Sequence, residues 1–88
     1  MTELTNDERK LLRAILTNDL HEAPLGEARI GSSIWCESIN NAAEPTGIKD
    51  GKILSVIVSR LAQKKLVISD GETIELTRAG YEAAVAAP

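Results

Sequence analysis

Residues 47–80 read GIKDGKILSVIVSRLAQKKLVISDGETIELTRAG, and most of the predicted architecture follows from them. The first half is typical of an amphipathic helix, because Asp50 is a favourable N-cap and aliphatic residues recur at helical spacing as far as about Lys65. One side of this helix is expected to pack and the opposite side to be exposed. The residues predicted to pack are Ile53, Leu54, Ile57, Val58 and Leu61.

A two-stranded β-hairpin is predicted directly after this helix. Residues 66–68 and 73–76 are short β-prone runs that flank Asp70 and Gly71. An Asp-Gly pair between such runs is a strong local signal for a hairpin.

Two further helices are predicted near the ends of the chain. Thr5 and Glu8 have the spacing of a capping box, which favours a helix over roughly residues 6–19. Thr77 is suited to cap a last helix that continues to about Ala86. The predicted packing contacts are Leu11, Leu12, Ile15 and Leu16 in the first of these helices, and Tyr81 and Val85 in the last.

The middle of the chain is expected to contain a loop and then one more helix. Residues 20–31 have no sustained periodicity and are predicted to form a loop, with a short strand at residues 28–30. Ser32 or Ser33 would cap the following helix, and Pro45 would end it. The residues expected to line its packed side are Ile34, Trp35, Ile39 and Ala42 or Ala43.

The length and composition of the chain favour one small α+β domain over residues 1–88. The lone Cys36 cannot form an intramolecular disulfide, and no apolar run approaches the ~20 residues needed to span a bilayer. A cytoplasmic, soluble protein without membrane association is therefore expected. Neither a nucleophile with a base nearby in the sequence nor a metal-ligand spacing is present, so no enzyme, cofactor or metal is predicted.

Residues 59–80, SRLAQKKLVISDGETIELTRAG, resemble a segment of MarR-like and PadR-like bacterial transcriptional regulators. In such proteins a recognition helix ends, a β-hairpin wing follows, and a Leu-Thr-x-x-Gly motif, which corresponds to Leu76 to Gly80, opens the closing helix. The resemblance implies a winged helix-turn-helix with a three-helix core, a two-stranded wing and a short C-terminal helix. It also implies binding of double-stranded DNA, regulation of transcription and a possible homodimer.

Charge is distributed unevenly along the chain, in a way that also favours a nucleic-acid partner. Residues 47–66 contain five basic residues and one acidic residue, a net charge of plus 4, so the remainder carries minus 7 of the total of minus 3. Because the whole chain is acidic, binding to DNA would have to be local to this segment.

Candidate DNA contacts follow from the predicted helix faces. Residues on the exposed face of the basic helix are candidates for reading base edges, and flanking basic or helix-terminal residues are candidates for binding phosphates. The base-reading candidates are Lys52, Ser55, Val56 and Ser59. The phosphate-binding candidates are Ser33, Lys49, Arg60, Lys64 and Lys65.

Acidic residues near the hairpin tip leave a second interpretation open. Asp70, Glu72 and Glu75 would repel phosphates, so the domain could instead be a protein-protein interaction module, such as an assembly subunit or a phage-type modulator.

Two other residues receive structural interpretations. Trp35 is interpreted as a core anchor, and His21 as an exposed side chain.

Overall fold

The structure, a computed structural model, describes residues 4–86. It contains three α-helices, three strands and two short 3-10 turns. In chain order they are α1 (Asn6–Leu16), η1 (Glu27–Arg29), β1 (Ile34–Trp35), η2 (Cys36–Ser38), α2 (Gly51–Gln63), β2 (Val67–Ser69), β3 (Thr73–Leu76) and α3 (Arg78–Ala86). The α+β class is confirmed, as are the first, basic and closing helices and the hairpin.

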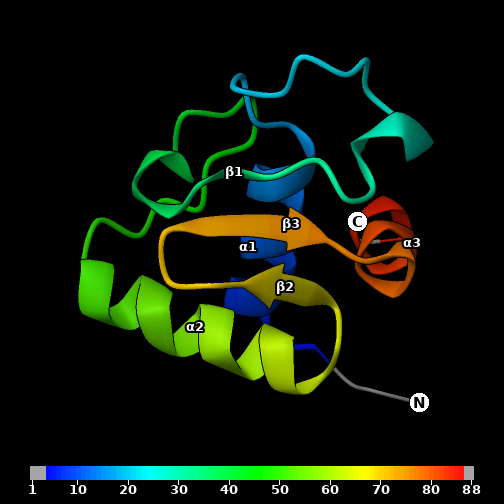
Figure 1. Cartoon of the computed structure of the whole chain (residues 1–88). Coiled ribbons are helices and arrows are strands. Elements are labelled where there is room, and N and C mark those ends of the chain that lie inside the picture. Colours follow the sequence, from blue (N-terminus) through cyan, green and yellow to red (C-terminus); the bar gives the residue numbers. More distant parts are fainter. Residues whose placement is uncertain (1–3, 87–88) are drawn as a thin grey trace.

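The sheet has three antiparallel strands in the order β1-β3-β2 instead of the two strands that were predicted. β2 pairs with β3 through Val67 opposite Leu76, and β1 adds to the other edge through Ile34 opposite Ile74. α1 lies behind the sheet, while α2 and α3 flank it (Figure 1). Within residues 4–86 no helix covers the front face.

The core lies between α1 and the sheet. The capping box at the start of α1 is present as predicted, with Thr5 and Glu8 hydrogen-bonding each other's backbone amides. The helix then directs its aliphatic side towards the inner side chains of β1 and β3. The fully buried members of this core include Leu11, Leu12, Ile15, Leu61, Ile74 and Leu76.

The helix predicted from Ser32 to Glu44 is wrong. Ile34 instead joins the sheet opposite Ile74, and the only helical geometry there is the three-residue turn η2. Alternation in β1 buries Ile34 and leaves Trp35 54% exposed, so Trp35 is not a core anchor. Pairing with β3 outweighed a weak local helix signal, because strand pairing both satisfies backbone groups and buries Ile34.

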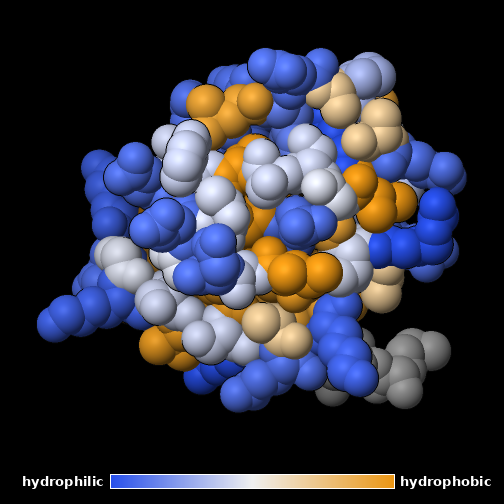
Figure 2. All heavy atoms as spheres, in the orientation of Figure 1, coloured by the Kyte–Doolittle hydropathy of each residue, from blue (hydrophilic) through white to orange (hydrophobic). Residues whose placement is uncertain are grey.

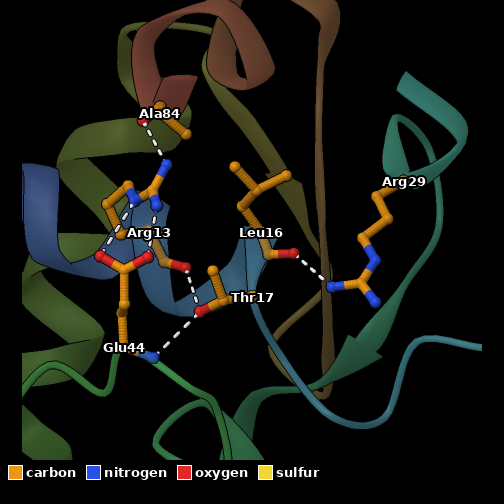
Figure 3. Close-up of polar contacts among 6 residues, drawn as sticks. All are labelled: Arg13, Leu16, Thr17, Arg29, Glu44 and Ala84. Carbon is orange, nitrogen blue, oxygen red and sulfur yellow. Dashed lines mark hydrogen bonds and ion pairs between the residues drawn. The ribbon is translucent and has the colours of Figure 1, made fainter. Parts of the chain in front are cut away.

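Residues 20–33 form a loop that is fixed to the end of α1. The strand predicted at residues 28–30 is wrong, since Glu27–Arg29 form the 3-10 turn η1. Arg29 Nη1 donates to the carbonyl of Leu16 at 2.6 Å (Figure 3), and its Nε donates to the carbonyl of Ala23. The arginine thereby satisfies a helix-end carbonyl that has no partner within α1.

His21 is also part of this anchor, so the prediction that it is exposed is wrong. Only 9% of its surface is accessible. Its Nε2 lies 2.8 Å from the carbonyl of Ile15 and its Nδ1 lies 2.9 Å from Ser32 Oγ. A carbonyl can only accept, so Nε2 carries the proton and donates to it. Burial lowers the pKa of His21, against the raising effect of that hydrogen bond.

A second polar cluster joins α1 to the segment before α2 and to α3. Arg13 binds the carboxylate of Glu44 and donates to the carbonyl of Ala84, while Thr17 Oγ1 accepts from the backbone amide of Glu44 (Figure 3). These contacts hold Glu44 against the C-terminal half of α1 without a helix in this segment.

α3 packs closely on the junction between α2 and β2. Thr77 Oγ1 accepts from the amide of Gly80, as expected of a cap, and donates to the carbonyl of Lys65. A side chain at Gly80 would meet the carbonyl oxygen of Leu66, because an ideal Cβ there lies 1.8 Å from it. The buried residues are Gly80 and Ala84, whereas Val85 is exposed, so its predicted packing role is wrong.

No helix in residues 4–86 is both long enough and apolar enough to cross a membrane.

Candidate nucleic-acid interface

α2 starts at a well-defined cap. Asp50 is the N-cap residue, and its carboxylate accepts from the backbone amide of Lys52 at 2.8 Å. Accepting one of the free amides of the first turn stabilises the start of the helix. The predicted cap is therefore confirmed, and the helix ends at Gln63, two residues earlier than expected.

The loop before α2 is held by Asn40, a residue that no sequence motif marks. Its Oδ1 accepts from the backbone amide of Thr46 at 2.9 Å, and its Nδ2 donates to the carbonyl of Ile48 at 2.7 Å. Thr46 is itself buried and accepts from the amide of Ile48 through its hydroxyl. This small network sets the position of Lys49 and Asp50 relative to the core.

The sides of α2 differ in burial largely as its sequence predicts. Ile57 and Leu61 are buried in the core, and Leu54 and Val58 are partly buried against it. Ile53 departs from the prediction, because it is 48% exposed. All four candidates for base reading lie on α2 and are exposed: Lys52, Ser55, Val56 and Ser59.

The phosphate candidates do not share one environment. Three of them are exposed on or beside α2: Lys49 lies just before the helix, Arg60 lies on it, and Lys65 lies just after it. Ser33 is exposed but precedes a strand, so the helix amides expected to accompany it are absent. Lys65 adopts a left-handed backbone with φ of 63°, which turns the chain from α2 into β2.

Lys64 lies in an ion pair with Glu8 of α1. Its ammonium group is 2.9 Å and 2.7 Å from the two carboxylate oxygens of Glu8, and Glu8 is only 1% exposed. Burial alone raises the pKa of Glu8, but hydrogen bonds from Lys64 and Thr5 outweigh that effect and hold the pKa below its usual value. A phosphate at Lys64 would therefore have to compete with a carboxylate that is already in contact.

A groove of about 500 Å³ runs between α2, η2 and the hairpin tip. Leu54, Val58 and Ala62 supply an apolar wall, and Ser55 and Ser59 lie on the α2 side as well. The opposite wall includes Cys36, Glu37, Ile39, Asn40, Ser69 and Gly71, with Lys49 also lining the groove. Ser55 and Ser59 are thus shared between the helix surface and this groove, and Cys36 Sγ is 3.7 Å from Ser69 Oγ.

The hairpin tip carries a fixed negative charge. Asp70 Oδ1 accepts from the backbone amides of Glu72 and Thr73, both at 2.9 Å, and these bonds lower the pKa of Asp70. Asp70 and Thr73 flank the turn, so its two central residues are Gly71 and Glu72, one position later than the predicted Asp-Gly pair. Gly71 has φ of 94°, a conformation that favours glycine in a hairpin turn.

These positions define an α+β domain that presents a basic helix next to an acidic hairpin tip. Comparisons of the chain with protein-family models, curated proteins and solved structures found no match.

Proposed function

We propose that this domain is a winged helix-turn-helix protein that binds double-stranded DNA sequence-specifically and regulates transcription. The order of elements supports the proposal, because the β2–β3 hairpin directly follows α2 and α3 closes the chain over their junction. One element departs from the pattern. The short turn η2 stands where a second helix was expected, and α2 is positioned by the Asn40 network instead.

The exposed surface of α2 is the observation that carries the proposal. The helix has 13 residues and contains no Asp or Glu. At ~1.5 Å per residue it is about 20 Å long, and the diameter of an α-helix with its side chains, about 10–12 Å, matches a major groove about 12 Å wide. Lys52 lies in its first turn, where recognition helices contact base edges.

The exposed cations around α2 also support the placement of this helix in the major groove. Lys49, Arg60 and Lys65 are exposed before, along and after α2, where they would meet phosphates on either side of the groove. Asp70 and Glu72 would be repelled by phosphates, so in this proposal the hairpin tip, which borders the groove beside Ser55 and Ser59, lies at the edge of the contact surface and meets no phosphate. A homodimer on a two-fold site would place its half-sites about 34 Å apart.

The proposal is tested by selecting bound fragments from a random duplex library at low salt and measuring affinities for the selected sequence. Lys52→Ala is expected to weaken binding to that sequence and to relax specificity at one position. Lys65→Ala is expected to weaken all sequences alike and to reduce the slope of log affinity against log salt by about one. Lys10→Ala, an exposed lysine on α1, is the matched control for charge and should leave binding nearly unchanged.

A second candidate function is docking to another protein, and the fixed charge of Asp70 favours it. The negative tip and Glu37 beside the groove are unfavourable near phosphates but compatible with a protein partner. If no duplex binds at low salt in the selection, the DNA proposal is refuted and the protein-docking function is preferred.

A further inference from the structure

Two large aliphatic side chains are exposed next to each other on α2. Ile53 is 48% exposed and Val56 is 51% exposed. They are three residues apart, so they lie on neighbouring turns of the same helix face. Figure 2 shows hydrophobic atoms between hydrophilic ones on this side of the molecule, including the region of α2.

Folding alone does not account for this pair. Ile57 and Leu61 already occupy the buried side of α2, and Leu54 and Val58 extend that side. Single exposed apolar residues are common on protein surfaces, and Ile68 on the front of the sheet is one. Ile53 and Val56 differ because they are adjacent and lie on the surface that carries Lys52 and Arg60.

We propose that Ile53 and Val56 contact the 5-methyl groups of two neighbouring thymines in the major groove. This inference rests on the proposed binding of duplex DNA through α2. Thymine is identified in the major groove partly by that methyl group, which aliphatic side chains contact favourably. An α-helix rises about 4.5 Å over three residues, close to the ~3.4 Å between stacked base pairs, so the two side chains suit adjacent steps.

The charge of the surface around Ile53 and Val56 favours DNA over an apolar protein surface as the partner. Lys49, Lys52 and Arg60 are exposed around the pair, and no acidic residue occurs within α2. A polyanion complements this surface, and thymine is the DNA base that also offers an apolar group in the major groove. Ile53 and Val56 thereby become specificity-determining residues of the proposed interface.

The test replaces thymine by uracil at single positions of the selected duplex, which removes the methyl group and keeps the base pairing. We expect two adjacent positions at which the 88-residue chain binds the uracil duplex about four-fold more weakly, the factor that corresponds to ~0.8 kcal/mol for one buried carbon. Ile53→Ala should abolish the difference at one position and Val56→Ala at the other. Ile68→Ala, at an aliphatic position on β2 that is 59% exposed, is the control and should preserve both differences.

The outcomes separate this inference from the proposed function. Strong binding of the selected duplex with no effect of uracil at any position would refute the methyl contacts and leave the DNA proposal standing. Uracil effects that persist in both Ile53→Ala and Val56→Ala would assign the methyl contacts to other residues and also overturn the inference. Failure of every duplex to bind would refute the proposed function, and the inference would fall with it.

Discussion

The ion pair between Glu8 and Lys64 gives the sharpest prediction for stability. Glu8→Ala removes an acceptor for the Thr5 amide and a carboxylate partner of Lys64 in one step. Loss of the capping box costs about 1 kcal/mol. Loss of the hydrogen bonds between charged groups adds about 1–2 kcal/mol, at the lower end of the usual range because the Lys64 side chain is 27% exposed and partly screened.

The expected total loss in the free energy of unfolding for Glu8→Ala is about 2–3 kcal/mol. For a domain of this size, this lowers Tm by roughly 10–20 °C. Glu8→Gln keeps an acceptor for the Thr5 amide but loses the charge, so its destabilisation should be about 1–2 kcal/mol. Chemical denaturation followed by circular dichroism measures both values. The control is Glu44→Gln, at the exposed ion pair with Arg13. It should lower the free energy of unfolding by clearly less than Glu8→Gln does.

The pH dependence provides an independent check of the same contact. Because the folded pKa of Glu8 lies below its usual value of 4.5, the stabilisation is complete above pH 4.5 and is lost as the pH falls through the folded pKa. The difference in stability between wild type and Glu8→Gln should therefore shrink below pH 4.5. A difference that stays constant from pH 7 to pH 3, or equal effects of Glu8→Gln and Glu44→Gln, would refute this account of the ion pair.

Three further predictions concern the scaffold around the interface. The pKa of His21 is lowered by burial, so stability should fall as the pH decreases from 6.5 through the folded pKa, and His21→Gln should flatten Tm over that range. Gly80→Ala should lower Tm strongly because its Cβ meets the carbonyl of Leu66, whereas Ala79→Ser at the exposed neighbouring position should not. Trp35→Ser should change the free energy of unfolding by less than about 1 kcal/mol, since an exposed side chain contributes little, and denaturation curves measure this.

Local sequence signals predicted the elements that are stabilised locally. The capping box of Thr5 and Glu8 and the Asp50 cap concern hydrogen bonds within one turn, and both are present as expected. The hairpin was also recognised from residues close together in the chain. The sequence therefore predicts α1, α2, the hairpin and α3 to within a few residues.

Contacts between distant residues were not predictable in the same way. Ile34 forms a strand because β3, about 40 positions later, offers a partner, and its neighbours alone gave a helical pattern. The ion pair likewise joins Glu8, near the start of α1, to Lys64, at the end of α2. For the candidate site, the exposed face of α2 was predicted except for Ile53, whose exposure depends on how the helix packs.

Amide chemical shifts report whether the exposed face of α2 meets DNA. A selected duplex is titrated into the isotope-labelled 88-residue chain at low salt, and the shift of each backbone amide is recorded. If α2 lies in the major groove, the largest shifts should occur at Lys52, Val56 and Ser59. Shifts concentrated at Trp35 and Ile68 on the front of the sheet would show that α2 is not the DNA-binding surface.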